Sequence, residues 1–125
     1  MADRTFLAIG GLVAAASVGL GAIGAHLLQG KLTPEQLVTY ETAVRYQMYH
    51  AIALILTGLA LRGGNSGLLT VTGWLFVVGL LLFPGGIYGW LFTGIRPFVR
   101  VVPFGGSLWI VAWVCFAVGC CKSGN

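Results

Sequence analysis

The stretch TAVRYQMYHAIALILTGLAL, residues 42–61, decides the fold because it joins a polar segment to an apolar one without a helix breaker. Its apolar part, residues 51–61, carries no charge but has only 11 residues. A helix needs about 20 residues to cross the hydrocarbon core of a bilayer. Twenty residues counted back from the end of the stretch take in all of it. The helix therefore spans a membrane only if Arg45, Gln47 and His50 lie inside the membrane or at its rim.

The start of this helix is predicted a little upstream. Thr33 is a good N-cap, Pro34 suits the first helical position, and Gln36 completes a T-x-x-Q capping box. Residues 34–42 form an amphipathic beginning. Because nothing breaks the pattern until Gly63, we expect one long helix rather than two short ones.

The composition places the chain in a membrane. Hydrophobic residues make up 58% of the chain, charged residues only 8%, and the mean hydropathy is +0.93. Soluble domains carry about 25% charged residues. The net charge is +4, but the basic residues stand singly at the ends of apolar runs. This pattern is typical of interfacial anchors near lipid phosphates and argues against nucleic acid as a partner.

We predict one all-α domain over residues 1–125, an integral membrane four-helix bundle with short loops. The spans are expected at about 5–28, 43–61, 68–92 and 101–121. The first apolar run is longer than the ~7–15-residue core of a signal peptide, so we interpret it as a retained helix. Pro84 and the two glycines after it predict a kink or local unwinding of the third span.

Small residues recur at four-residue spacing, which in membrane helices indicates close contact with other helices. The predicted packing positions are Gly11, Ala15 and Gly19 in one row, Ser17, Gly21 and Ala25 in another, and the pair Gly85 and Gly89.

Polar residues gather toward one end of the expected bundle. Four antiparallel spans place both termini on one side, and the loops near residues 29–42 and 93–100 on the other. The candidate site is the polar cluster at that loop end: His26, Glu41, Arg45, Tyr46, Gln47, His50, Arg96 and Arg100. Four Lys and Arg residues at the loop end against three at the terminal end are too small a bias to fix the orientation.

Two contacts within this cluster are expected. Glu41 and Arg45 are spaced i, i+4 in the order that favours an ion pair. His50 is expected to face residues 19–22 of the first helix, where glycine leaves room for an imidazole. Its role stays open between a neutral packing residue and a proton-sensitive group.

Neither a metal site nor a catalytic site is predicted. His26 and His50 differ in depth by about 12 Å, too much for one ion. The chain has no paired carboxylates and no Gly-x-Ser-x-Gly motif, so we expect no enzyme and no cofactor. Cys120 and Cys121 suit either apolar packing or S-acylation.

Four sequence blocks resemble one family across essentially the whole chain: GAIGAH at 21–26, TAVRYQMYHAIAL at 42–54, TGIR at 93–96 and PFGG at 103–106. They are similar to the domain of unknown function 423 family of small YgdD-type membrane proteins. The resemblance implies four membrane helices and no established activity. The characteristic polar residues of the family correspond to His26, Arg45, Tyr46, Gln47, His50 and Arg96. Pro84 departs from the family, which usually has a serine–glycine–serine-like piece there.

Two functions fit these observations. The first is a structural or accessory subunit that packs against a larger membrane complex or against itself. The alternative is binding or transport of an anionic lipid, quinone or other small ligand at the polar cluster. Either function implies membrane lipids as partners, and the resemblance points to a bacterial inner (plasma) membrane.

Overall fold

The computed structural model describes residues 1–123, and these residues are helical apart from short turns and one isolated bridge between Gln29 and Leu32. The helices are α1 (Ala2–His26), α2 (Pro34–Arg62), α3 (Gly67–Thr93), α4 (Pro97–Arg100) and α5 (Val102–Ser123). The predicted all-α class is therefore confirmed.

The caps anticipated from the sequence are present. At the start of α2, the Thr33 hydroxyl accepts from the Gln36 backbone N–H at 3.1 Å, and the Thr33 N–H donates to Gln36 Oε1 at 2.9 Å. These two bonds satisfy groups that a helix end leaves open. Ser66 caps α3 in a similar way through the Leu69 N–H. Gly94 ends α3 in the left-handed conformation, with φ 73°, which glycine adopts without strain.

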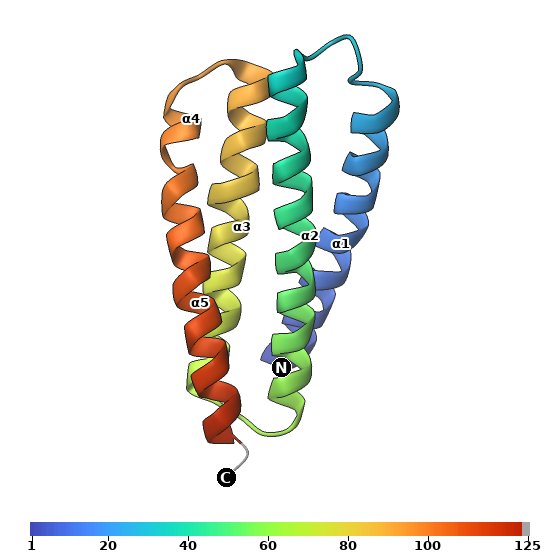
Figure 1. Cartoon of the computed structure of the whole chain (residues 1–125). Helices are drawn as coiled ribbons and strands as arrows, with labels where there is room; N and C mark the ends of the chain where they lie inside the picture. The colour runs from blue at the N-terminus through green and yellow to red at the C-terminus, as the bar shows by residue number, and fades with distance from the viewer. Residues whose placement is uncertain (124–125) are drawn as a thin grey trace.

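The four long helices run alternately up and down, and both termini lie at the same end (Figure 1). The closely packed neighbours are α1 with α2, α2 with α3, and α3 with α5. The short α4 packs on α3 and leads into α5. This arrangement is compatible with the predicted four-helix bundle, with α1 and α5 as the two flanking helices.

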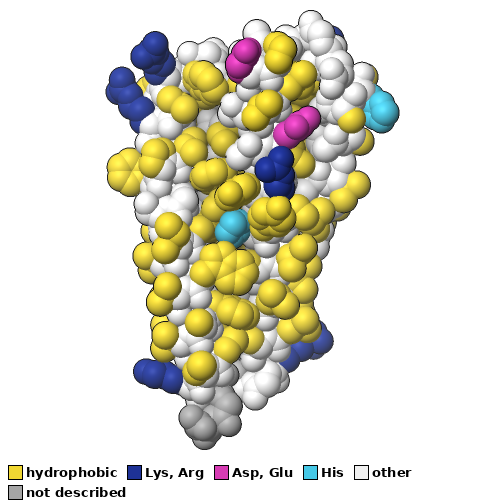
Figure 2. All heavy atoms as spheres, in the orientation of Figure 1, with side chains coloured by type: hydrophobic (Ala, Val, Ile, Leu, Met, Phe, Trp, Pro, Cys, Tyr) yellow, Lys and Arg dark blue, Asp and Glu magenta, His cyan; other side chains and the backbone are white. Residues whose placement is uncertain are grey.

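Three helical segments are long and apolar enough to cross a membrane: Ala2–His26, Gly67–Thr93 and Pro97–Lys122. The longest helix, α2, is not among them by composition, yet it lies between its neighbours along its length (Figure 1). On the face shown in Figure 2, hydrophobic side chains cover the middle, and most of the charged side chains in view lie toward the two ends.

The helices approach each other closely at glycines. A Cβ on Gly10 of α1 would lie 2.8 Å from the Ala51 carbonyl oxygen of α2. A Cβ on Gly105 of α5 would lie 2.6 Å from the Phe83 backbone nitrogen of α3. At both places backbone meets backbone, so a side chain has nowhere to go.

Two glycines of α3, Gly73 and Gly79, receive aromatic rings instead of backbone. The fully buried ring of Phe6 fills the space above Gly73, and the Trp109 indole fills the space above Gly79. Both rings belong to the buried core, which also contains Leu54. Glycine thus leaves the space in which large rings are buried between the helices.

The predicted small-residue rows divide between two faces of α1. Gly11 and Gly19 meet no atom of residues 1–123 within 4 Å at their Cβ positions, and Ala15 of the same row is exposed. The face toward α2 carries Phe6, Gly10, Ser17 and Gly24, which are buried. Because successive residues are about 100° apart on a helix, Gly11 points well away from the α2-facing side that Gly10 occupies.

The remaining predicted packing positions are also divided. A Cβ on Gly21 would lie 3.7 Å from the Val44 side chain of α2. Ala25 is exposed. Gly89 receives the Phe98 ring. Gly85 meets only a carbonyl oxygen of its own helix.

The expected unwinding at Pro84 does not occur, because α3 is helical without interruption from Gly67 to Thr93. Proline removes one backbone donor, and the loss is local. Pro84 is fully buried, and α3 packs against α2 on one side and α5 on the other. These packing contacts stabilise the helical conformation of α3 on both sides of Pro84.

Candidate functional site

Helix α2 carries the polar residues at the centre of the molecule, but it presents them in different directions. Gln47 and His50 are buried, whereas Glu41, Arg45 and Tyr46 are exposed to different extents. Gln47 faces α1 and α3, and His50 faces α5. The predicted cluster is therefore divided into separate sites.

Gln47 connects three helices. Its Oε1 accepts from the Tyr88 hydroxyl of α3 at 2.7 Å, and its Nε2 donates to the Val13 carbonyl of α1 at 3.4 Å. About two helical turns earlier on α2, the hydroxyl of buried Tyr40 donates to the Leu20 carbonyl of α1. The Tyr40 ring packs against Gly24. The amide and the two phenols thus connect α1, α2 and α3 through buried or half-buried polar contacts.

His50 is held against α5. Its ring stacks on Trp109 with centroids 3.6 Å apart and planes 5° apart. Trp113 Nε1 lies 3.1 Å from His50 Nε2, and His50 Nδ1 lies 2.7 Å from the Tyr46 carbonyl oxygen. An indole N–H only donates, so Nε2 accepts and Nδ1 carries the proton. His50 is therefore the neutral imidazole, and both of its ring nitrogens are hydrogen-bonded.

Two sequence-based expectations, one for His50 and one for Glu41 with Arg45, are wrong. His50 does not face residues 19–22 of α1, because the Trp109 and Trp113 rings of α5 bind it on the other side of α2. Glu41 and Arg45 do not form the expected ion pair: within residues 1–123, both ion pairs involve Asp3, with the N-terminus and with Arg62. Exposed and close to the loop end, the Glu41 and Arg45 side chains gain little from pairing.

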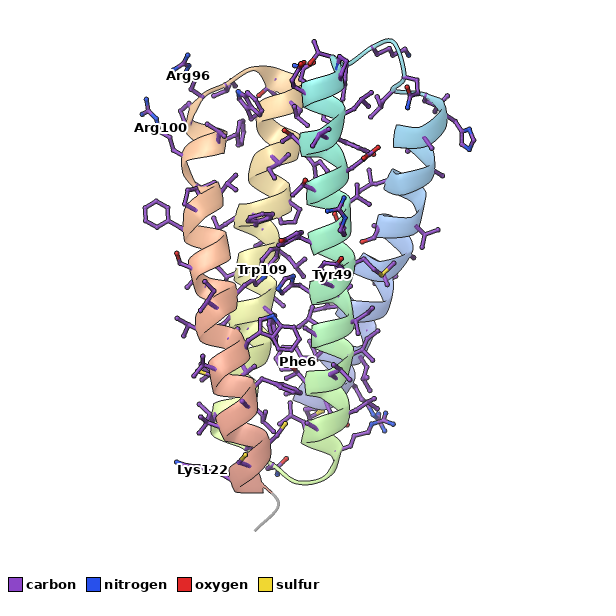
Figure 3. All side chains as sticks on the ribbon, viewed as in Figure 1. Phe6, Tyr49, Arg96, Arg100, Trp109 and Lys122 are labelled. Carbon is purple, nitrogen blue, oxygen red and sulfur yellow. The ribbon has the colours of Figure 1, made fainter. Side chains whose placement is uncertain are left out.

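A groove opens between α2 and α5 beside His50, with a volume of about 470 Å³. We call it the α2–α5 groove. Its principal lining residues are Tyr46, His50, Phe83, Gly106, Trp109 and Trp113. In Figure 2 one histidine side chain lies in the middle of a hydrophobic face, and Figure 3 shows Trp109 pointing from α5 toward α2.

The other predicted residues do not reach this groove. Arg96 and Arg100 extend outward at the α4 flank of the loop end (Figure 3), and exposed His26 ends α1 on the opposite flank. Glu41 and Arg45 line a separate groove of about 280 Å³ with Gly21, Gly24 and Ala25 of α1. At the other end, Cys120 packs beside the core and Cys121 is exposed.

The sequence did not identify three residues that complete these sites. Tyr88 is the partner of Gln47, and Trp109 and Trp113 are the partners of His50. Two tryptophans four residues apart lie on one helical face, a signal that they meet one common neighbour. Nothing in the sequence pairs Tyr88 with residue 47, 41 positions away.

Comparison with known proteins finds relatives that are named as membrane proteins. The chain is 37% identical over 119 residues to the UPF0382 membrane protein SAB0533 of Staphylococcus aureus (strain bovine RF122 / ET3-1), covering 95% of this chain and 97% of the relative. It is 37% identical over 120 residues to the UPF0382 membrane protein YwdK of Bacillus subtilis (strain 168), covering 95% and 98%. No solved structure matches the chain.

The helices, the apolar surface and these relatives together define a small helical membrane protein. The chain belongs to the family described as "Protein of unknown function (DUF423)", which matches residues 20–106. The family predicted from the four sequence blocks is thereby confirmed.

Proposed function

We propose that the protein is an accessory subunit of a larger complex in the bacterial inner membrane, an integral four-helix bundle that docks a membrane helix of its partner on the outer face of α1. The bacterial relatives named as membrane proteins support the location. The open row of small residues on α1 supports the docking.

The proposal includes α2 as the fourth span. Helix α2 has 29 residues. Its length is about 42 Å, which exceeds the ~30 Å hydrocarbon core. It packs on α1 and α3, which are long and apolar enough to cross. Its polar groups at Gln47 and His50 are hydrogen-bonded within the protein, as polar groups at membrane depth must be.

The observation that carries the docking role is the contrast between two glycine-containing faces of α1. Gly10 and Gly24, on the inner face, are filled by α2, whereas the Cβ positions of Gly11 and Gly19 on the outer face meet open space. Small residues at this spacing let two helix backbones come close in lipid, where dispersion contacts drive association. A lone helix flanking the bundle gains nothing from such a face unless another helix covers it.

Replacing Ala15 by leucine should disrupt this docking. The protein is purified from native membranes in mild detergent, and co-purifying proteins are quantified. We expect wild type to carry one partner at fixed stoichiometry. Ala15→Leu should reduce that partner about tenfold, which corresponds to about 1.4 kcal/mol of lost association energy.

The matched control is Ala117→Leu, which makes the same change at an exposed position of α5. Ala117→Leu should retain the partner. A monomer without any partner in wild type, or equal losses in the two variants, would contradict the proposal. Recovery of a second copy of this chain in place of a different protein would replace the accessory role by self-association.

The predicted alternative, binding or transport of an anionic lipid, quinone or other small ligand at the polar cluster, has less support as one site built around the arginines. Arg96 is the N-cap of α4 and Arg100 its last residue, whereas Arg45 lines a groove against α1. The three guanidinium groups thus lie on different parts of the loop end. The α2–α5 groove, which has no charged side chain in its lining, has better support as a ligand site.

A further inference from the structure

The α2–α5 groove lies near the middle of the helices. Tyr46 and His50 are 12 and 16 residues beyond the first residue of α2, Pro34. These separations correspond to about 18 Å and 24 Å along a helix about 42 Å long. The groove volume of about 470 Å³ falls in the range of small-molecule sites. Because it opens on the hydrophobic face of the molecule, a ligand would enter it from the bilayer (Figure 2).

The wall of the groove is a set of rings held in fixed positions. The Tyr46 ring stacks on Phe83 with centroids 5.4 Å apart and planes 20° apart. Phe83 contacts Trp109 at 4.8 Å, and Trp109 stacks on His50 at 3.6 Å. Both ring nitrogens of His50 are hydrogen-bonded within the protein. Such a wall favours a flat ring as its ligand over a flexible chain.

One lining residue of the groove, Tyr46, carries an unused hydrogen-bond donor. The Tyr46 hydroxyl makes no hydrogen bond to any residue in the part of the chain that the structure describes, although Tyr46 lies near the middle of α2. Ser107, another lining residue, donates to the Pro103 carbonyl at 2.9 Å and keeps its lone pairs as acceptors. A phenol in an apolar medium gains from an acceptor on a ligand.

The lining contains no charged side chain, which disfavours a lipid phosphate or a carboxylate. An acyl chain would neither stack on the rings nor accept from Tyr46. We propose that the α2–α5 groove binds a quinone-type lipid, with an uncharged flat ring against the aromatic wall, a ring carbonyl accepting from Tyr46, and an isoprenoid tail in the bilayer. This site is independent of the docking face on α1.

The test uses the full chain in lipid nanodiscs, titrated with a benzoquinone that carries one isoprene unit. Quinones quench indole fluorescence, and Trp109 and Trp113 line the groove. We expect saturable quenching beyond that of free tryptophan added to empty nanodiscs. Tyr46→Phe keeps the ring and removes the hydroxyl, and it should weaken binding about fivefold, as expected for the loss of one neutral hydrogen bond.

A second variant fills the groove. A Cβ at Gly106 meets only the Phe83 ring, at 3.7 Å and 3.8 Å, so Gly106→Leu fits without backbone strain and places its side chain in the groove. It should abolish the saturable quenching. Tyr49→Phe is the control, because Tyr49 is an exposed phenol of α2 outside the groove lining, and it should bind as wild type does.

Three results would overturn the proposal. The first is quenching that never saturates, which indicates partition into lipid alone. The second is equal affinity in wild type and Gly106→Leu. The third is full displacement of the quinone by an equal concentration of an isoprenoid alcohol without a ring, which would assign the groove to lipid tails.

Discussion

Replacement of Gly10 by leucine should lower the free energy of unfolding by about 3 kcal/mol, at the upper end of the cost of overpacking. The same replacement at the adjacent Gly11 should not lower it, because the added side chain meets open space and leucine is the better helix former. The Cβ position of Gly10 lies 2.8 Å from the Ala51 carbonyl oxygen, a backbone atom of α2 that cannot rotate away. The Cβ position of Gly11 has open space.

The two variants form a matched pair, because both exchange glycine for leucine in the same turn of the same helix. Any gain in helix propensity is therefore shared, and only the contact with α2 differs. The measurement is equilibrium unfolding in mixed micelles, followed by circular dichroism. Equal stabilities of the two variants would show that α1 does not pack on α2 through the face of Gly10.

Replacement of Gln47 by leucine should lower the free energy of unfolding by about 1–2 kcal/mol. Leucine cannot accept from the Tyr88 hydroxyl, which Gln47 binds at 2.7 Å between α2 and α3. The Val13 carbonyl of α1 loses its side-chain donor as well. A phenol left without its partner in an apolar site accounts for most of the loss.

The double variant Gln47→Leu/Tyr88→Phe separates the lost bond from the changed packing. Since it removes both partners, it should recover much of the stability lost in Gln47→Leu. A double-mutant cycle measured in the same micelles should give a coupling of about 1 kcal/mol. Strictly additive losses would indicate that Gln47 and Tyr88 do not interact.

The helix boundaries could be read from the sequence because local groups determine them. Thr33, Pro34 and Gln36 specify the start of α2, and the capping box is formed by those residues themselves. The end of α2 at Arg62 follows from the glycines after it. Such signals depend only on neighbours within one turn, so the sequence contains them in full.

The directions of the polar side chains could not be read in the same way. Gln47 and His50 are only three residues apart, and both are buried, but one binds α1 and α3 while the other binds α5. Which side a buried polar group takes depends on partners 34 to 63 positions away. Depth along the helix follows from counting residues, whereas rotation about its axis is set by tertiary packing.

The small-residue rows have a similar limit. The spacing of Gly11, Ala15 and Gly19 marks a row of small residues, and within residues 1–123 the two glycines of this row meet no atom at their Cβ positions. The same helix carries a second such face through Gly10 and Gly24, and that face meets α2. Spacing alone does not tell which face is used within the chain and which is left for a partner.

The central claim is that α2 crosses the bilayer with its polar residues inside the span. Its most direct test is the depth of spin labels on outward-facing α2 positions, in a chain whose three native cysteines are replaced by alanine. Val38, Tyr49 and Leu59 are all exposed on α2, near its start, middle and end (Figure 3 labels Tyr49). In lipid vesicles, oxygen access relative to a water-soluble nickel complex should be greatest at Tyr49 and lower at Val38 and Leu59. Nickel access at Tyr49 equal to that at Val38 would contradict the claim and place α2 at the membrane surface.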